Sequence, residues 1–299
     1  MVEELRAALG VDLASKDLLK RYAYASDASH YLRVPEAVVV AESIRDIVEI
    51  TSIALRNSVP MTFRSGGTSL SGQSSGNGIL VDTRRAFKQI ELLDGGGRVR
   101  VQAGATLRAV NARLAPHGRI LGPDPASDIA CTIGGVIANN SSGMAAGTEL
   151  NSYRTLESLV AVLPSGTVID SSAPGASDAL RLHEPSLVGT LERLRDRIRS
   201  DVSQSSEVRE RFSMKNTMGY GLNSFLDFDD PLDILVHLLI GSEGTLAFVA
   251  EAVFRTIPLD PEVATGLLVF GSMEDATAAL PTLVKTGAAT LELMDSTLD

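Results

Sequence analysis

The sequence predicts an α+β protein built from two α/β subdomains, after which a third unit begins. An apolar, β-branched run at 37–41 ("AVVVA") is followed by a helical pattern and a second strand at 61–64 ("MTFR"), which together predict a β-α-β unit. After a glycine-rich loop, the pattern changes to short strands separated by turns. Near residue 263 a strand-helix-strand pattern starts again. These three observations predict the fold class.

Composition places the chain among folded globular proteins and narrows its partners. The 299 residues are 44% hydrophobic, and the net charge of −10 argues against a nucleic acid or an anionic membrane as the main partner, which leaves a small ligand. A single cysteine, Cys131, excludes an internal disulfide and an iron–sulfur cluster held by this chain alone. The four histidines are too scattered for a zinc site, so no metal is predicted.

The N-terminus gives no sign of a secretory leader. "MVEELRAALG" is charged and amphipathic, and no segment of the chain runs 18 apolar residues without a break. We therefore expect no transmembrane segment and a cytoplasmic protein, and we leave open a peripheral position at the inner face of the cell membrane.

The elements of the first half follow from local patterns. Residues 1–34 predict a short helix and a polar connector that ends at Pro35. Ser43 is expected to cap the helix that follows the first strand. "ILVDT", "FKQIELLD" and "RVRVQAG" predict short strands, with "GGG" at 95–97 as a hairpin turn. "TLRAVNARLAPHG" predicts a helix that stops at Gly118.

The second half alternates regular elements with long polar stretches. Residues 123–148 and 213–226 show no clean periodicity, whereas "LESLVAVLPSGTVID" predicts a hairpin and "EPSLVGTLERLRDRIRS" a capped helix. A helix, a "GSEG" turn and a long strand follow at 231–259. From 263 we expect a strand ("ATGLLVFG"), a helix ("MEDATAALPTLVKT") and an incoming strand ("ATLELMD"). This last unit cannot close a sheet, so the sequence is expected to be an N-terminal fragment.

The loop "TFRSGGTSLSGQ" at 62–73 raises the question of its ligand. Its glycines allow positive φ and close approach of a ligand, and its hydroxyl groups add neutral donors. It lacks the lysine of a P-loop and the spacing of a Rossmann fingerprint, so NAD is not expected. A pyrophosphate diester such as that of FAD suits this loop as a ligand. A flexible surface loop that binds nothing is an equally good interpretation of the same residues. A second stretch of the same kind, "TIGGVIANNSSG" at 132–143, favours a cofactor cleft between the two.

Four motifs in order resemble a known family. "PEAVVVAES", "RSGGTSLSGQ", "LGPDPAS" followed by "TIGGVIANNSSG", and "GSEGTLAFVAEA" are similar to the FAD-linked oxidases of the vanillyl-alcohol oxidase / p-cresol methylhydroxylase type. The resemblance covers roughly 35–260. "NNSSGMAAGTELNSYRTLESLVAVLPSGTVID" and "FSMKNTMGYGLNSFLD" look most like bacterial flavin and iron–sulfur D-lactate dehydrogenases, which are relatives of glycolate oxidase and D-2-hydroxyglutarate dehydrogenase.

The resemblance implies a domain division and a cofactor. Residues 1–34 would be an N-terminal helix and connector, 35–262 a two-subdomain FAD-binding domain of the p-cresol methylhydroxylase type, and 263–299 the start of a truncated α/β cap that binds substrate. The implied FAD-binding residues are Arg64, Ser65, Gly66, Gly67, Thr68, Ser69, Pro123, Asp124, Ser127, Thr132, Ile133, Gly134, Gly135, Asn139, Gly143, Glu243 and Gly244.

Two positions bear on how FAD would be held. Relatives that bind the flavin covalently through the glycine loop have His where this sequence has Thr68, so that linkage is excluded. Cys131 lies one residue from the position of a flavin-linked cysteine, and a small buried side chain is the preferred interpretation. FAD is therefore expected to be bound non-covalently.

The implied reaction is oxidation of a small D-2-hydroxy acid, with D-lactate as the first choice. The α-hydrogen would leave as hydride to FAD, and electrons would pass to an iron–sulfur domain downstream or to another, unspecified acceptor. The family's metal ligands and most of its substrate-carboxylate ligands would lie beyond residue 299, so no activity is expected of this chain alone. Alternatives are an FAD-binding module without turnover, a glycolate or D-2-hydroxyglutarate dehydrogenase, or an alcohol or sugar oxidase that uses O₂.

The sequence assigns no catalytic residue. Lys215, Asn216 and Tyr220 are candidates for the flavin edge by resemblance, although capping of a turn is the preferred interpretation. His237 lies on an apolar helix pattern and is interpreted as a core or helix-face histidine.

Overall fold

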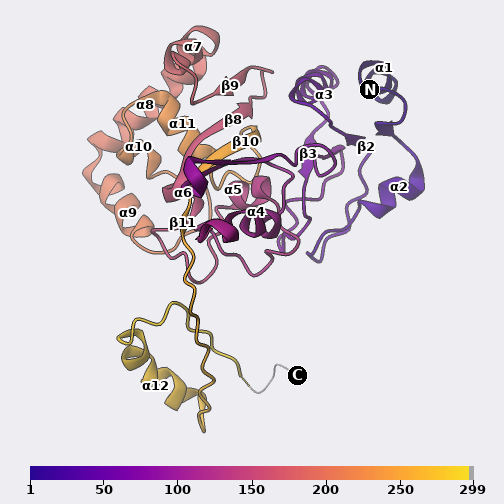
Figure 1. Cartoon of the computed structure of the whole chain (residues 1–299). Helices are drawn as coiled ribbons and strands as arrows, with labels where there is room; N and C mark the ends of the chain where they lie inside the picture. The colour runs from indigo at the N-terminus through magenta and orange to yellow at the C-terminus, as the bar shows by residue number, and fades with distance from the viewer. Residues whose placement is uncertain (296–299) are drawn as a thin grey trace.

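A computed structural model describes residues 1–295 of the chain. Two sheets lie side by side in the main body, each with helices packed against it, and the C-terminal segment leaves this body (Figure 1). The mixture of a small, mainly parallel sheet and a larger antiparallel one confirms the predicted α+β class.

The first sheet is the predicted β-α-β unit with one strand inserted. β2 (Ala37–Val40) and β3 (Met61–Arg64) both pair in parallel with β4 (Ile79–Asp82), which lies between them. α3 (Ile44–Arg56) connects β2 to β3, and Ser43 caps it through a reciprocal bond pair with Asp46, as predicted. Because all three strands end at the same edge, the loop that follows β3 opens there.

The N-terminal residues complete this subdomain. α1 (Val2–Leu9) contacts α3, and β1 (Ala14–Ser15) pairs antiparallel with β2. α2 (Leu18–Ala23) follows and leads into the connector, whose residues Ser26 and Leu32 form an isolated bridge. The connector is therefore a short hairpin-like turn.

The second sheet is antiparallel, in the order β5-β6-β10-β8-β9. β5 (Ile90–Leu93) and β6 (Arg98–Gln102) form the predicted hairpin around the 3₁₀ turn η1 (Asp94–Gly96). β8 (Leu156–Val162) and β9 (Val168–Asp170) form the other predicted hairpin, and β10 (Phe248–Arg255) enters between the two from late in the sequence. β7 (Arg119–Ile120) and β11 (Ile257–Pro258) make a separate small pair.

Helices surround this sheet, some of them where no helix was expected. α4 (Leu107–Leu114) and the 3₁₀ turn η2 (Ala115–His117) end at Gly118, which is left-handed as predicted. α5 (Ile133–Asn139) lies inside the stretch predicted to be irregular. The others are α6 (Ser152–Thr155), α7 (Ala176–His183), α8 (Pro185–Ser200), α9 (Val202–Phe212), α10 (Ser224–Asp227) and α11 (Pro231–Leu239).

The N-terminus of α8 departs from the capped helix that the sequence predicts. Its N-cap residue, Glu184, makes no side-chain bond to the helix, and its carboxylate instead accepts hydrogen bonds from Ser165 and from Thr167 (2.6 Å). The helix begins at Pro185, whose ring fixes a helical φ and which has no N–H to satisfy. The carboxylate thus ties the β8–β9 turn to the helix.

Two clusters of buried apolar residues correspond to the two sheets, and one strand joins them. Phe248 at the start of β10 contacts Phe63 on β3, with ring centroids 4.8 Å apart, and Phe87, at 5.4 Å. Phe248 belongs to the cluster under the first sheet, whereas Phe254 at the other end of β10 is buried in the cluster under the second. Strand β10 therefore fixes the two subdomains against each other beside the loop after β3.

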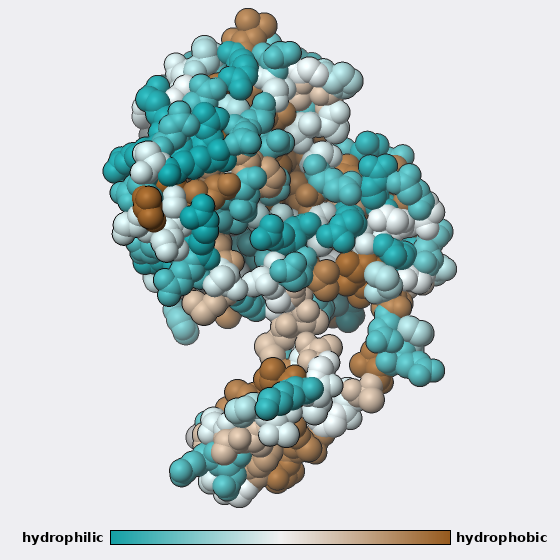
Figure 2. Space-filling view, turned by 90° about the vertical axis from the view of Figure 1, so that its left-hand side faces the viewer, coloured by the Kyte–Doolittle hydropathy of each residue, from teal (hydrophilic) through white to brown (hydrophobic). Residues whose placement is uncertain are grey.

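The C-terminal segment agrees with the prediction only in its helix. α12 (Met273–Val284) forms with Ser272 as its cap, but neither 264–271 nor 289–295 is a strand. Both predicted strands are wrong because a strand needs a partner, and no other strand pairs with either range within residues 1–295. Figure 2 shows apolar side chains on the surface of this segment. The side chains of Val263, Leu267 and Val269 are more than 70% exposed.

None of the helices among residues 1–295 has the length and apolar character needed to cross a membrane.

Candidate functional site

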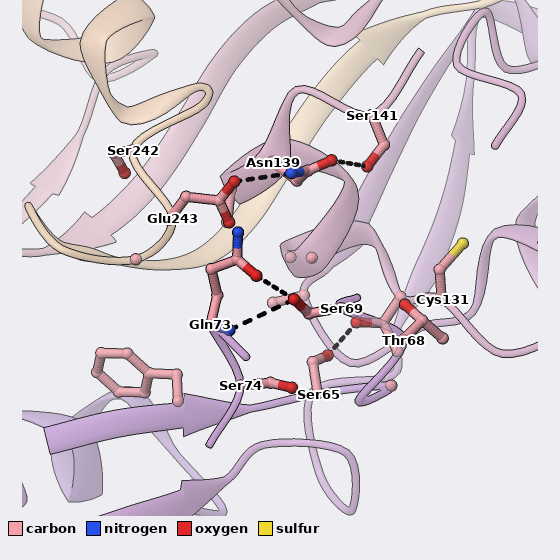
Figure 3. A pocket seen from close by; sticks show the side chains of 18 of the residues that line it. Ser65, Thr68, Ser69, Gln73, Ser74, Cys131, Asn139, Ser141, Ser242 and Glu243 are labelled. Atoms are coloured by element: carbon pink, nitrogen blue, oxygen red, sulfur yellow. Dashed lines mark hydrogen bonds between the residues drawn. The ribbon is translucent and has the colours of Figure 1, made fainter. Parts of the chain in front are cut away.

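A cleft of about 650 Å³ lies where the two subdomains meet. Most of its lining comes from β3 and the loop after it, the stretch around α5, and the turn between α11 and β10 (Figure 3). Thr83, Ala103, Lys215 and Thr217 complete it. This volume lies within the range of small-molecule and cofactor sites. The two glycine-rich stretches singled out in the sequence therefore face one cavity.

Backbone geometry explains the glycines of the first loop. Gly67 and Gly72 have φ of +71° and +83°, a region that favours glycine. A Cβ on Gly66 would overlap the carbonyl oxygen of Ala130, so the first loop lies directly against the second. The hydroxyl of Ser65 bonds that of Thr132 across the same junction (Figure 3). The structure thus joins the two loops at the floor of the cleft.

Arg64 lies under the loop and does not line the cleft. Its Nη2 donates to the Ser26 carbonyl at 2.6 Å and its Nη1 to the Ser74 carbonyl at 3.1 Å, while the N–H of Ala28 donates to Gly67 O at 3.0 Å. Burial lowers the pKa of this guanidinium. Its side chain therefore fastens the N-terminal connector to both ends of the loop.

The stretch around α5 presents its residues unequally. Ile133 is fully buried in the core of the second subdomain, so only its backbone lies near the cleft. Gly134 lies against Ala103, because a Cβ there would come within 2.9 Å of the Ala103 Cβ. Gly135 faces open space, since the nearest atom to its Cβ position is Thr132 Oγ1 at 3.9 Å. Gly135 is thus the point where a ligand can approach the backbone of α5.

A backbone bridge supports the next part of the wall. Asp124 and Gly143 form an isolated parallel bridge, and the Asp124 N–H donates to Ser142 O at 2.9 Å. Ser127 and Gly143 line the cleft, whereas Pro123 and Asp124 do not. The buried hydroxyl of Ser142 lines the cleft without a hydrogen-bond partner among the described residues.

Glu243 is the acidic side chain of the cleft. Its carboxylate accepts from Asn139 Nδ2 at 2.7 Å, and the Asn139 amide oxygen accepts from Ser141 Oγ at 2.8 Å. Burial raises the pKa of this carboxyl. Glu243 and Gly244 both have positive φ, of +54° and +72°. In Figure 3 the amide end of Gln73 points from the opposite wall toward Glu243.

The three flavin-edge candidates separate in the structure. Lys215 lines the cleft, and its Nζ donates to Gly143 O at 2.6 Å. Asn216 does not line it, and its Oδ1 accepts from Met218 N at 3.0 Å, as in a capped turn. The hydroxyl of Tyr220 bonds Thr245 Oγ1 at 2.9 Å from outside the lining.

Several lining residues were not singled out by sequence reasoning. They include Phe63, Gln73, Ser74, Thr217, Ser242, Thr245 and Phe248. Most continue a motif that had been recognised, so extending each motif by a few residues would have found them. Cys131 also lines the cleft, and burial raises the pKa of its thiol, which keeps it protonated.

The chemistry of the lining suits FAD. The glycine cradle leaves backbone groups accessible where side chains would block them, and hydroxyl and amide donors from both loops face the cavity. Apolar side chains such as Phe63, Leu239 and Phe248 supply surface for flat aromatic rings. The residues present therefore suit a ligand that combines a pyrophosphate with ring systems.

His237 lies away from the cleft and gives a test of pH dependence. Its ring stacks on Phe228 with centroids 3.9 Å apart, and burial lowers its pKa. Because the unfolded chain then binds this proton more readily, folded-state stability should fall as the pH drops below about 6.5. We expect the free energy of unfolding in urea to fall between pH 7.5 and pH 5.5 in both proteins, and to fall less in His237→Gln than in the wild type, by about 1 kcal/mol or less. Equal losses would contradict the assignment.

Comparison with known proteins agrees with this geometry. Residues 35–172 match the family model described as FAD binding domain. The chain is 32% identical to D-2-hydroxyglutarate dehydrogenase of Haemophilus influenzae over 92% of its own length and 28% of that protein. It is 29% identical to D-lactate dehydrogenase of Archaeoglobus fulgidus, over 85% of this chain and 47% of that one. The chain thus spans between about a quarter and a half of these relatives.

A solved structure shows the same fold. Alkyldihydroxyacetonephosphate synthase superposes with a TM-score of 0.62 over 96% of this chain and 46% of that one, at 17% sequence identity. The glycine cradle and the matched family model support FAD as the cofactor. Residues 35–172 of the chain therefore match the model of the FAD binding domain family, and the fold is of the p-cresol methylhydroxylase type that the sequence motifs predict.

Proposed function

We propose that the cleft holds FAD non-covalently. The backbone of 65–69 and the residues around Thr132, Gly135 and Gly143 would hold the pyrophosphate and the adjoining part of the flavin, and Glu243 and Gly244 the adenosine half. Thr68 has no imidazole that could form a covalent bond to the flavin, and burial keeps the Cys131 thiol protonated. The main support is the convergence of both glycine loops on one cavity.

The proposed activity of the whole protein is oxidation of a small D-2-hydroxy acid. Bound FAD supplies an acceptor for the hydride of the α-carbon. This chain's own residues would bind and orient FAD and, through the apolar part of the lining, exclude water from one side of it. We propose that 35–262 form the FAD-binding domain, that a substrate-binding domain begins near 263, and that electrons leave through a further domain or acceptor.

Two substrates are the leading candidates. D-lactate is favoured by the motif resemblance, and D-2-hydroxyglutarate by relatives of that name that are 29–32% identical to this chain over at least 92% of its length. Since the chain spans 28% of those relatives, turnover by residues 1–299 alone is not expected.

The cofactor proposal has a direct test. The purified chain, supplied with FAD, should retain yellow colour after gel filtration, and acid precipitation should release the flavin into the supernatant. A well-folded sample that retained no FAD would refute the cofactor site. Flavin that stayed with the pellet would refute the non-covalent assignment.

The substrate proposal is tested on the full-length protein. Anaerobic addition of D-lactate, D-2-hydroxyglutarate or glycolate should bleach the flavin absorption, and the substrate with the highest bleaching rate identifies the activity. Bleaching by none of the three would favour a different oxidation, such as that of an alcohol or sugar.

A further inference from the structure

The charge in the cleft comes from two side chains. Of the lining residues, which all lie in the described part of the chain, only Lys215 and Glu243 have charged side chains; the others are apolar or bear neutral polar groups. Glu243 is engaged by Asn139 at 2.7 Å, and burial favours its neutral form. Lys215 is thus the cation that a ligand in this cleft meets.

The Lys215 ammonium is held in place and still has capacity to bind. Its Nζ donates to Gly143 O at 2.6 Å, and no carboxylate within residues 1–295 forms an ion pair with it. An ammonium has three N–H donors, so two remain for other partners. The carbonyl of Gly143 fixes the ammonium beside the wall at 141–143, which lines the same cleft.

Arg64, the other cation near the glycine loop, does not take this role. It lies outside the lining, and its two terminal nitrogens donate to the carbonyls of Ser26 and Ser74 at 2.6 and 3.1 Å. Its charge is therefore separated from the cavity by the loop that it supports.

We propose that Lys215 is the anion-binding residue of the cleft and pairs with a phosphate of FAD or with the carboxylate of the 2-hydroxy acid. The chain has a net charge of −10, so an anion in this partly enclosed site is disfavoured unless a cation meets it. The inference rests on the proposed function, because that function names both ligands.

Three variants separate the charge of Lys215 from its hydrogen bond to Gly143. Lys215→Met removes both, Lys215→Gln keeps a donor without the charge, and Lys215→Arg keeps the charge. Lys88→Met is the matched control, since Lys88 is exposed and does not line the cleft. Thermal unfolding of each variant identifies any that fail to fold.

Two affinities are measured for each variant at low and high salt. One is the affinity for FAD, from flavin fluorescence. The other is the affinity of the FAD-loaded chain for oxalate, a dicarboxylate that cannot be oxidised as a hydroxy acid is, from changes in flavin absorption. Loss of a charged contact should weaken the relevant affinity about tenfold or more at low salt, and less at high salt.

The outcomes distinguish the source of the anion. A loss of FAD affinity in Lys215→Met and Lys215→Gln, but not in Lys215→Arg or the control, identifies a phosphate; a loss of oxalate affinity alone identifies a carboxylate. Three results would overturn the inference. In the first, Lys215→Gln keeps both affinities within twofold of the wild type. In the second, Lys215→Gln keeps its FAD affinity and even the wild type binds no oxalate, and in the third, Lys215→Arg binds the ligand as weakly as Lys215→Met. Failure of the wild type to bind FAD would instead overturn the proposed function.

Discussion

Gly143→Ala is expected to destabilise the chain by about 3 kcal/mol or more and to abolish FAD binding. Gly143 has a φ of +70°, and a Cβ at this position would overlap the carbonyl oxygen and carbon of Asp124. The two residues form a backbone bridge, so neither can move without separating the segments they join. One of those segments carries Ser127 and the other Ser141 and Ser142, and all three line the cleft.

The loss of stability in Gly143→Ala should come mainly from the overlap of the new Cβ with Asp124, and less from the positive φ. A second glycine, which has positive φ but no such overlap, separates these two causes. Gly147 also has positive φ, +52°, but nothing lies within 4 Å of its Cβ position. Gly147→Ala should therefore cost only the conformational strain, about 1 kcal/mol. Urea unfolding and FAD titration of both variants give the comparison. Equal losses of stability would show that the Asp124 contact contributes little.

The sequence could predict those parts of the fold that depend on neighbours along the chain. α3 and its Ser43 cap were predicted because the apolar positions repeat along one continuous helix and the cap lies directly before it in the sequence. α5 was missed because its segment "IGGVIAN" contains two glycines, and its stability comes from burying Ile133, Val136 and Ile137 in the core. The prediction of two strands after 263 was wrong for the opposite reason. The apolar pattern of a strand is local in the sequence, whereas the strand that it must pair with is not.

The candidate site divides in the same way. Glycine and hydroxyl content identified both loops, and Ser65, Thr68, Gly135 and Glu243 do line the cleft. The direction of each side chain could not be predicted from the sequence: that of Arg64 lies under the loop and that of Ile133 in the core, so only their backbones remain candidates for contact with the cofactor. Phe248 was not singled out because its contact with Phe63 joins residues far apart in the chain.

Substitution of Gly135 is expected to raise stability and lower FAD affinity at the same time. The residue lies inside α5 without positive φ, so Gly135→Ala should stabilise the helix by about 0.5–1 kcal/mol. The nearest protein atom to the added methyl group would be Thr132 Oγ1, at 3.9 Å, which is ordinary van der Waals contact. It projects into the space proposed for the cofactor, so FAD affinity should fall about tenfold, as expected for overpacking by one carbon.

The neighbouring glycine gives the opposite result and is the control. Gly134→Ala would bring its Cβ within 2.9 Å of Ala103 Cβ, so this variant should lose stability despite the same gain in helix propensity. Thermal unfolding without FAD, followed by FAD titration, measures both quantities for each variant. Gly135→Leu should bind FAD more weakly than Gly135→Ala while remaining folded, because the larger side chain fills more of the cleft. If Gly135→Leu bound FAD as tightly as the wild type, the cofactor would not approach α5 at this residue, and that part of the proposed FAD site would have to be abandoned.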